Sequence, residues 1–495
     1  MHSYPRPGAH LRHKALFFLL LAVATVPALG QQVQLQPVDC TDVMGFMIGG
    51  LSTPRLDRLV RQRGVSFALD QPAEKALSAA GASLQLLRSI RAATSSTASA
   101  AGCPATLSHT AELIQQKQYH EARSILVKSV SGEPEKPALH FALGYIHQQE
   151  EDWDEAFDAY SDARDLMPGL PDVHARLAFL YYRDNDGDSA IAEARTALSM
   201  DPTNAEAYRY LGLGFYTNGQ YAAALHAFDE SLVREPDNAD VYYDKGITLH
   251  DNGDLRAAAA AYRKAISLNP RFWEAYNNLG MVLHDSGNFT SAIAAYREAR
   301  RLAPEEPSVR YNLGNTYCDQ GDFDAAATVL RELFRTNPGW QRGHSCLAKA
   351  LMVKREYEAA ISELRLAILQ NPTSGAEHRV LGQALLLVRQ PQDALRELRT
   401  AVELDPDSAL AHHYLGTALF STEDFAAAEA EFRLALRLEP TANNHYYLAA
   451  CLMSMGRLDT ALAELETAAR LEPGQNLYRS RKEELLKLMN APSAH

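Results

Sequence analysis

The sequence lacks the short motifs that mark most enzyme classes. None of its 495 residues forms part of a Walker phosphate loop, a GxSxG nucleophile elbow, an HExxH zinc motif or a CxxC pair. Nucleophiles, general bases and metal ligands need such defined arrangements to act together. The sequence therefore predicts a protein that is not an enzyme, with no catalytic residues and no cofactor.

An excess of positive charge and long apolar runs are missing as well. The chain has 61 Asp and Glu residues against 48 Lys and Arg residues, and its net charge is −13. An acidic chain of this size repels nucleic acid and anionic membranes, whereas it attracts a basic protein surface. Beyond residue 30, no apolar stretch approaches the length of a membrane span. We therefore expect protein or peptide partners, basic ones in particular, and neither nucleic acid nor a membrane span.

What the sequence does contain is a regular series of prolines. They stand 34 residues apart without interruption, and a fixed period of this size is the mark of a solenoid built from one repeated unit. Each proline lacks a backbone donor and crowds the residue before it, so it ends one helix and begins the next unit. The series consists of Pro134, Pro168, Pro202, Pro236, Pro270, Pro304, Pro338, Pro372, Pro406 and Pro440.

Two small residues recur at fixed distances after each proline. The tenth residue is glycine or alanine, as in Gly144, and the twenty-second after the first nine prolines is always alanine, as in Ala156. The last unit is one residue short, so its alanine, Ala461, comes one place early. Small residues at two fixed points, with large apolar residues at helical spacing, predict two antiparallel helices in close contact. Glycines such as Gly219 fall between the two helices, where a left-handed residue ends the first one.

This pattern closely resembles the tetratricopeptide repeat, a helix–turn–helix unit of 34 residues with the same Gly/Ala, Tyr/Leu, Ala and Pro sites. The resemblance covers residues 103–475 in about eleven units, and it implies an all-α fold, a right-handed α-solenoid. Residues 476–495 are predicted to form a capping helix and a tail, because a solenoid has to cover its last apolar face. In this family the first helix of each unit lines the concave face, where ligands usually lie.

The N-terminal end has the three parts of a secretory signal. Basic residues precede an apolar run from Ala15 to Val26, and the small residues Ala28 and Gly30 follow it. We therefore predict a signal peptide over residues 1–30 and an exported protein, periplasmic or secreted. An uncleaved N-terminal anchor is the alternative.

Between the signal and the repeats lies a segment without the 34-residue pattern. Residues 31–93 are predicted to form a small helical module, since Ser52, Asp70 and Ser83 each precede a helical pattern. The module resembles a segment of some bacterial exported repeat proteins, which favours a bacterial periplasm. Residues 94–102 have the composition of a linker.

Five cysteines are present. Cys40 and Cys103 flank the module, and they could pair in an oxidising compartment, but nothing in the sequence fixes their distance. Cys318, Cys346 and Cys451 occupy first-helix positions of the repeats. We interpret these three as small apolar side chains that fill the core.

The first helices carry candidate peptide-binding residues of three kinds. Aromatic side chains offer broad contact area at low entropic cost, and asparagine can bond a peptide backbone as donor and acceptor. Aspartates at equivalent positions favour a basic peptide, while part of the tyrosines are expected only to pack between repeats. The resemblance places the candidates at Phe141, Tyr145, Tyr182, Tyr216, Tyr243, Asn277, Asn278, Tyr311, Asn312, Asn315, Asp251, Asp285 and Asp319.

One series of histidine and cysteine raises the question of a metal. His250, His284 and Cys318 occupy equivalent positions in three consecutive units, and each is followed by an aspartate. Successive helices of a solenoid stand about 8–10 Å apart, whereas metal ligands have to converge on one ion. These three residues are therefore weak candidates, and we predict no metal site.

Two functions of different classes fit these features. The first is a non-catalytic protein–protein interaction scaffold that binds partner proteins or peptides in the concave groove of the repeats. The second is a regulatory or assembly subunit of an envelope enzyme or secretion complex. The sequence does not distinguish between them.

Overall fold

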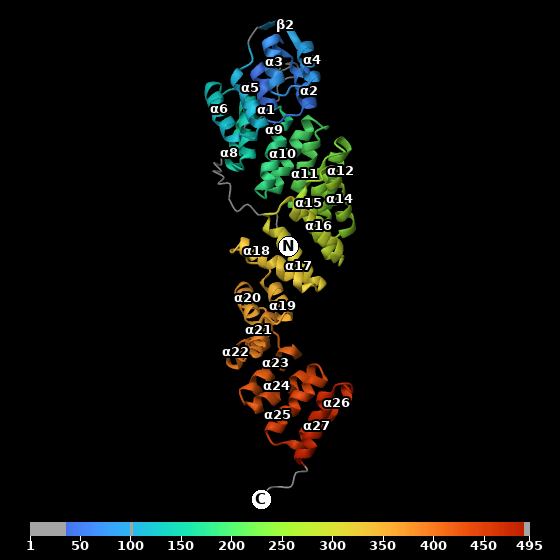
Figure 1. Cartoon of the computed structure of the whole chain (residues 1–495). Helices are drawn as coiled ribbons and strands as arrows, with labels where there is room; N and C mark the ends of the chain where they lie inside the picture. Colours follow the sequence, from blue (N-terminus) through green and yellow to red (C-terminus); the bar gives the residue numbers. More distant parts are fainter. Residues whose placement is uncertain (1–35, 100–101, 490–495) are drawn as a thin grey trace, which may run out of the picture. The chain divides into compact units, whose positions relative to one another are not determined.

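The structure of the protein is a computed structural model that describes residues 36–99 and 102–489 (Figure 1). The predicted signal peptide, residues 1–30, lies outside the described residues. Within the described part of the chain, no helix is both long enough and apolar enough to span a bilayer. The chain divides into two compact units, Met1–Asn269 and Pro270–His495.

Successive helix pairs make up most of both units, and the prediction of an all-α solenoid is confirmed. Each pair occupies one period of the sequence, and its two helices contact each other. The pairs of the first unit are α5 (Ala105–Gln115) with α6 (Tyr119–Gly132), α7 (Pro137–Gln149) with α8 (Trp153–Leu166), α9 (Pro171–Arg183) with α10 (Gly187–Met200), α11 (Ala205–Thr217) with α12 (Tyr221–Arg234), and α13 (Ala239–Asp251) with α14 (Leu255–Leu268).

The second unit continues the same arrangement with six pairs in its described residues. They are α15 (Trp273–Asp285) with α16 (Phe289–Leu302), α17 (Pro307–Gln320) with α18 (Phe323–Thr336), α19 (His344–Val353) with α20 (Tyr357–Gln370), α21 (Gly375–Leu387) with α22 (Pro391–Leu404), α23 (Ala409–Ser421) with α24 (Phe425–Leu438), and α25 (Ala442–Ser454) with α26 (Leu458–Leu471).

The turn between the two helices has the same backbone conformation in all eleven pairs. One residue of each turn has a φ between 59° and 86°, which is the left-handed region. Glycine adopts this conformation without steric cost, as at Gly321. In the other six pairs this residue is not glycine, as at Arg355 and Arg389. The left-handed conformation then costs roughly 1–2 kcal/mol per residue. The packing of the helix pair therefore imposes this turn, even where the sequence has no glycine.

The two helices of a pair approach closely where a small residue faces a ring. A Cβ added to Gly246 of α13 would lie 2.6 Å from the ring of Tyr262 on α14. In the next pair, a Cβ added to Gly280 would lie 2.6 Å from the ring of Tyr296. Both tyrosines are buried. The small residue ten positions after each proline therefore makes room for a large side chain of the second helix.

The N-terminal module, defined here as residues 36–99, is built from four helices and two short strands. Asp39, Asp70 and Ser83 each accept a hydrogen bond from a backbone N–H in the first turn of the helix that follows. The elements are α1 (Cys40–Ile48), α2 (Thr53–Arg63), β1 (Val65–Phe67), α3 (Gln71–Ala79), α4 (Leu84–Ala93) and β2 (Thr94–Ser99).

The prediction of a linker over residues 94–102 is wrong for residues 94–99. Thr94–Ser99 forms β2, which pairs in parallel with β1, so that Val65 lies opposite Thr94 and Phe67 opposite Ser99. Small polar residues suggested a flexible segment, but their backbone groups pair with the edge of β1 instead.

The module packs against the first repeats, as its small size predicts. Helix α1 contacts α5 and α7, and the apolar side chains of the module share one core with those of the first repeats. Cys40, the first residue of α1, forms a disulfide with Cys103, which precedes α5, and their Cα atoms are 5.2 Å apart. The possible pairing of these two cysteines is thus present in the structure.

The array ends in a single helix, α27 (Asn476–Met489), which packs against α26. Its own side chains Tyr478 and Leu485 are buried, whereas Leu488 is exposed. Residues 490–495 of the predicted tail lie outside the described residues. The helix covers the apolar side of the last pair, the role predicted for a cap.

Candidate functional site

The candidate binding residues all lie on the first helices of the pairs. We call the surface that these helices form the first-helix face; in the first unit it consists of α7, α9, α11 and α13, and in the second of α15, α17, α19, α21, α23 and α25. Its geometry differs between the two units.

In the first unit, the module covers the beginning of the first-helix face. Phe141 of α7 is completely buried, and its ring centroid lies 5.8 Å from that of Phe46 of α1. A Cβ added to Gly49 would lie 2.4 Å from the Phe141 ring, so the glycine lets the backbone of the module approach that ring closely. The prediction that Phe141 contacts a partner is therefore wrong, because the chain's own module occupies that position.

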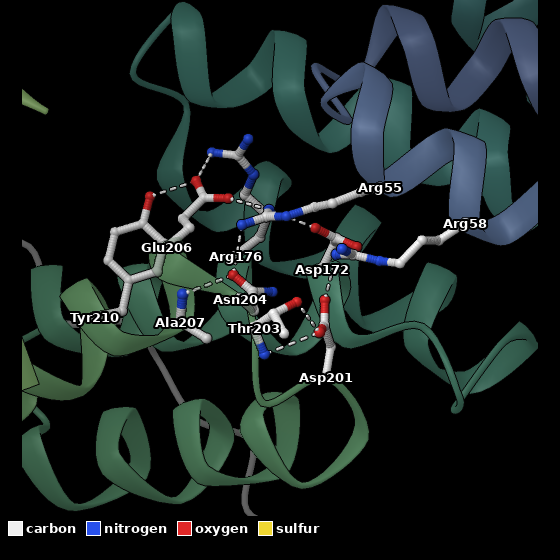
Figure 2. Close-up of polar contacts among 10 residues, drawn as sticks. All are labelled: Arg55, Arg58, Asp172, Arg176, Asp201, Thr203, Asn204, Glu206, Ala207 and Tyr210. Carbon is white, nitrogen blue, oxygen red and sulfur yellow. Dashed lines mark hydrogen bonds and ion pairs between the residues drawn. The ribbon is translucent and has the colours of Figure 1, made fainter. Parts of the chain in front are cut away.

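Arg55 of α2 extends the docking of the module to two further first helices (Figure 2). Its guanidinium donates hydrogen bonds to Asp172 of α9 at 2.6 Å and to Glu206 of α11 at 2.9 Å. It also donates to the side-chain oxygen of Asn204 at 2.6 Å. The Arg55 side chain is only 12% exposed, and Asp172 only 6%. This is a desolvated, charge-assisted contact.

Further residues complete this cluster of charges. Arg176 of α9 forms an ion pair with Glu206 at 2.9 Å, and the Tyr210 hydroxyl donates to Glu206 at 3.0 Å (Figure 2). Arg58 of α2 pairs with Asp201 at 2.7 Å, but its side chain is 44% exposed. The buried cluster thus holds two carboxylates between two guanidiniums.

The two carboxylates respond differently to this environment. Burial raises the pKa of Asp172, and Arg55 opposes the rise without overcoming it. Burial also acts to raise the pKa of Glu206, but Arg176 and Arg55 outweigh it and lower the pKa to about 2. Glu206 is therefore ionised over the whole physiological range and anchors Arg55.

Arg55 and its partners were not among the residues predicted from the sequence. A signal does exist, because the residue four positions after the proline is acidic in consecutive units, at Asp172, Glu206, Asp240 and Glu274. No pattern in the sequence, however, indicates that Arg55 reaches two of these acids.

Beyond the module, the first-helix face of the first unit carries half-buried tyrosines. The Tyr216 hydroxyl donates to Asp251 of the next first helix at 2.5 Å. Burial, together with this bond, raises the pKa of Tyr216. The ring centroids of Tyr243 and Tyr262 lie 5.9 Å apart, so Tyr243 packs inside its own pair. Tyr145 and Tyr182 are also half-buried, and these predicted contact residues expose only part of their rings.

In the second unit, asparagines link consecutive first helices. The Asn312 amide donates to the side-chain oxygen of Asn277 at 3.0 Å, and the Asn277 amide donates to that of Asn278 at 3.2 Å. Asn277 is buried, so it orients its neighbours rather than meeting a partner. Asn278, Asn312 and Tyr311 remain half-buried.

Two exposed aspartates, Asp285 and Asp319, lie on the same two helices as these asparagines. His284 lies between them, with its Nε2 2.9 Å from Asp319 and its Nδ1 3.3 Å from Asp285. The Asn315 amide also donates to Asp319 at 3.1 Å. The side chains of Asp285 and Asp319 are 40% and 47% exposed. The predicted residues Asn315, Asp285 and Asp319 therefore belong to one polar cluster centred on His284.

Cys318 and Cys346 are not small core fillers, as was predicted for them. They form a disulfide between α17 and α19, with their Cα atoms 6.1 Å apart. The first helices of these two consecutive units stand close enough for a disulfide. The residue types at the two positions do not show this distance. Cys318, a weak metal candidate in the sequence, therefore has no thiolate to offer a metal ion. His250, another of those candidates, is buried.

A different cluster brings possible metal ligands together in the first unit. One ligand atom each of His147, Glu150 and Asp152 lie within 4.8 Å of one another. Arg123, however, pairs with Glu150 at 3.0 Å and with Asp152 at 2.7 Å. A guanidinium already occupies the position where a cation would be held.

The chain matches two family models. The model of the cilia and flagella-associated protein 70 C-terminal domain matches residues 170–381. A tetratricopeptide repeat model matches residues 112–171 and 379–444. No curated protein sequence matches the chain significantly.

Several solved structures are similar to the chain. MamA is 26% identical over 33% of this chain and 95% of its own, with a TM-score of 0.29. The pilF protein of Pseudomonas aeruginosa is 20% identical over 45% of this chain and 95% of its own, with a TM-score of 0.36. Yeast Tom70 is 15% identical over 78% of this chain and 96% of its own, with a TM-score of 0.31.

The repeat models match within the helix pairs, whose period, small-residue sites and turns are those of the sequence pattern. The chain contains tetratricopeptide repeats, which the repeat model matches over residues 112–171 and 379–444.

Proposed function

We propose that the protein is a non-catalytic scaffold that binds partner proteins or peptides on its first-helix face. The observation that carries this proposal is the docking of the module, in which α1 packs on α7 while Arg55 reaches α9 and α11. Here the first helices already hold a helical segment from outside the repeats, through apolar contacts and one arginine. A partner segment would use the same kind of contact.

The first-helix face of the second unit has the matching chemistry. Asp319 is exposed, and the described residues that bond to it are His284 and Asn315. Its negative charge is therefore offered to a basic side chain of a partner, as that of Glu206 is to Arg55. The half-buried side chains of Asn278 and Asn312 lie on the same two helices, α15 and α17, and can bond a peptide backbone.

The proposal can be tested with labelled peptides that differ in charge. We expect Asp285→Asn with Asp319→Asn to weaken the binding of arginine-containing peptides at least about tenfold in fluorescence anisotropy, because charge-assisted hydrogen bonds contribute about 1.5–3 kcal/mol each. Glu403→Gln on α22, an exposed acid of a second helix, is the matched control and should change nothing. Equal affinities of both variants and the original protein would contradict the proposal.

We also propose that the protein is exported to the periplasm or the outside of the cell. Its two disulfides support this, because such bonds persist in oxidising compartments. In unreduced, denatured protein purified from its own compartment, a thiol reagent should react with one cysteine, Cys451. Five reactive thiols would contradict export.

A further inference from the structure

A pocket on the second helices of the second unit contains three arginines. It has a volume of about 580 Å³ and lies where α16 and α18 meet over α17. None of its lining residues is acidic. They include Arg297, Arg300, Arg301, Tyr317, Thr328 and Val329. On a chain with a net charge of −13, this is a local concentration of positive charge.

The first of the three arginines, Arg297, is held by a hydroxyl and not by a carboxylate. The Nε and Nη2 groups of Arg297 donate to the Tyr317 hydroxyl oxygen at 3.1 Å and 2.7 Å, and Tyr317 is buried. Among the described residues, Arg297 forms no ion pair with an acid at salt-bridge distance. Its positive charge is therefore oriented but not neutralised.

The other two arginines have only weak interactions with acidic side chains. Arg300 has Glu332 as its nearest acidic partner, at 3.9 Å, which is too long for a hydrogen bond. Arg301 pairs with Glu298 at 2.8 Å, but its side chain is 64% exposed, and exposed pairs of this kind contribute little. Three guanidiniums thus line one pocket, and acidic side chains compensate their positive charge only weakly.

Two of these residues depart from the repeat pattern. The position of Arg300 holds an apolar residue in most other units: Leu198, Leu232, Ile266, Phe334, Ile368, Val402 and Leu436. The position of Tyr317 holds leucine in six other units: Leu249, Leu283, Leu351, Leu385, Leu419 and Leu452. Packing between helices is therefore satisfied without either polar group. Both departures occur at the same pocket.

The helix dipole accounts for only part of this arrangement. Arg300 and Arg301 lie in the last turn of α16, where cations favourably oppose the helix dipole. That effect does not require Tyr317 to hold Arg297, nor does it require a pocket. It also operates equally well for arginines that point into solvent.

We infer that this pocket binds a small organic dianion, a phosphate monoester or a dicarboxylate carried on an apolar body. The planar guanidinium forks match the oxygen geometry of both groups. Leu313 and Val329 provide an apolar wall for the body of the ligand, and the volume suits a small molecule. Thr328 donates its hydroxyl hydrogen to the backbone of Asp324 at 2.9 Å, so the arginines and not Thr328 supply the donors.

Isothermal titration of the full chain with phenyl phosphate and with phthalate tests the inference and separates the two ligand chemistries. We expect at least one of them to bind, and the affinity to fall as salt is added. Arg300→Leu restores the residue type of the other units, so the helix pair should fold normally. It should lower the affinity about tenfold, as the loss of one charge-assisted contact does.

The matched control is Arg365→Ala on α20, an exposed arginine at the position equivalent to Arg297, one unit beyond α18. This change should leave binding unaltered. Tyr317→Leu, which frees Arg297, should weaken binding like Arg300→Leu. Absence of binding to both ligands, or equal affinities of the original protein and Arg300→Leu, would overturn the inference. So would an equal loss in Arg365→Ala, because binding would then follow general surface charge.

Discussion

The two compact units use the same helix pair for different purposes. In the first unit, acidic side chains of the first helices are buried, and Arg55 of the module neutralises them. In the second unit, the acids at Asp285 and Asp319 remain exposed around a histidine. The acids near the start of the first helices are therefore buried partners of the module in the first unit, whereas the acids near the end of the first helices are exposed in the second unit.

The largest expected effect comes from breaking the module's buried contact. Arg55→Ala leaves Asp172 and Glu206 with one guanidinium fewer, and loss of one partner of a buried ion pair costs roughly 3–5 kcal/mol. Compared with the original protein, hydrogen exchange should be faster in residues 36–269 and unchanged in residues 270–489. Arg58→Ala, at the exposed pair with Asp201, is the control and should cost less than about 1 kcal/mol. Equal loss from both changes would mean that the module docks through surface charge alone.

A second test asks whether the two helices of a pair pack in the same way in both units. Gly246→Ala in the first unit and Gly280→Ala in the second each add a Cβ 2.6 Å from a buried tyrosine ring. Both should destabilise by roughly 1–3 kcal/mol through overpacking. Gly339→Ala, whose added Cβ would meet nothing within 4 Å, is the control for urea denaturation. A cost at only one of the two sites would show that the pairs are not equivalent.

The pH should affect the first unit through His174. Burial acts to lower its pKa, but the bond of its Nδ1 to Glu193 at 2.6 Å and the Pro168 carbonyl at its Nε2 raise it overall. A raised pKa means that the stabilisation is complete below the unfolded pKa and is lost as the pH rises through the folded one. We expect the Tm of the first unit to fall as the pH rises from below the ordinary histidine pKa through the raised pKa of the folded state. His174→Gln should flatten this dependence, and an unchanged slope would exclude His174 as its source.

The smallest effect should come from the turns. Arg389→Gly in the second unit replaces a residue at φ 61° with one that tolerates the left-handed region. We expect a gain of roughly 0.5–1 kcal/mol, since the relief of strain exceeds the added entropy of the unfolded chain. Gly253→Ala makes the reverse change in the first unit, where φ is 84°, and should destabilise by a similar amount in thermal denaturation. The same sign for both changes would contradict the steric origin of the turn.

The periodic part of the fold was predictable because its causes are local. Proline spacing, the small residue at Gly246 and the glycine at Gly321 each act within one helix pair, and the structure has the pairs and turns that they predict. Thr94–Ser99 was assigned to a linker because its pairing with β1 depends on a segment almost thirty residues earlier.

The candidate site was less predictable because its contacts join distant parts of the chain. Arg55 meets Asp172 across a sequence separation of 117 residues, and no periodicity connects them. Phe141 has the residue type of a contact site, and only the position of α1 shows that it is buried. Cys318 and Cys346 fit the apolar positions of their helices, so their disulfide depended on the distance between two units of the repeat.

Asn204 makes the start of one helix depend on the docking of the module. Its side-chain oxygen accepts a hydrogen bond from the Ala207 N–H at 2.9 Å, which begins α11, and another from Arg55 at 2.6 Å (Figure 2). Arrays of repeats ordinarily unfold in stages, because each repeat contacts only its neighbours. Here a bond from α2 to the cap of α11 couples segments well beyond nearest neighbours, so the first unit should unfold as one cooperative block. The second unit, whose described contacts run from one pair to the next, retains the freedom to fray from its end.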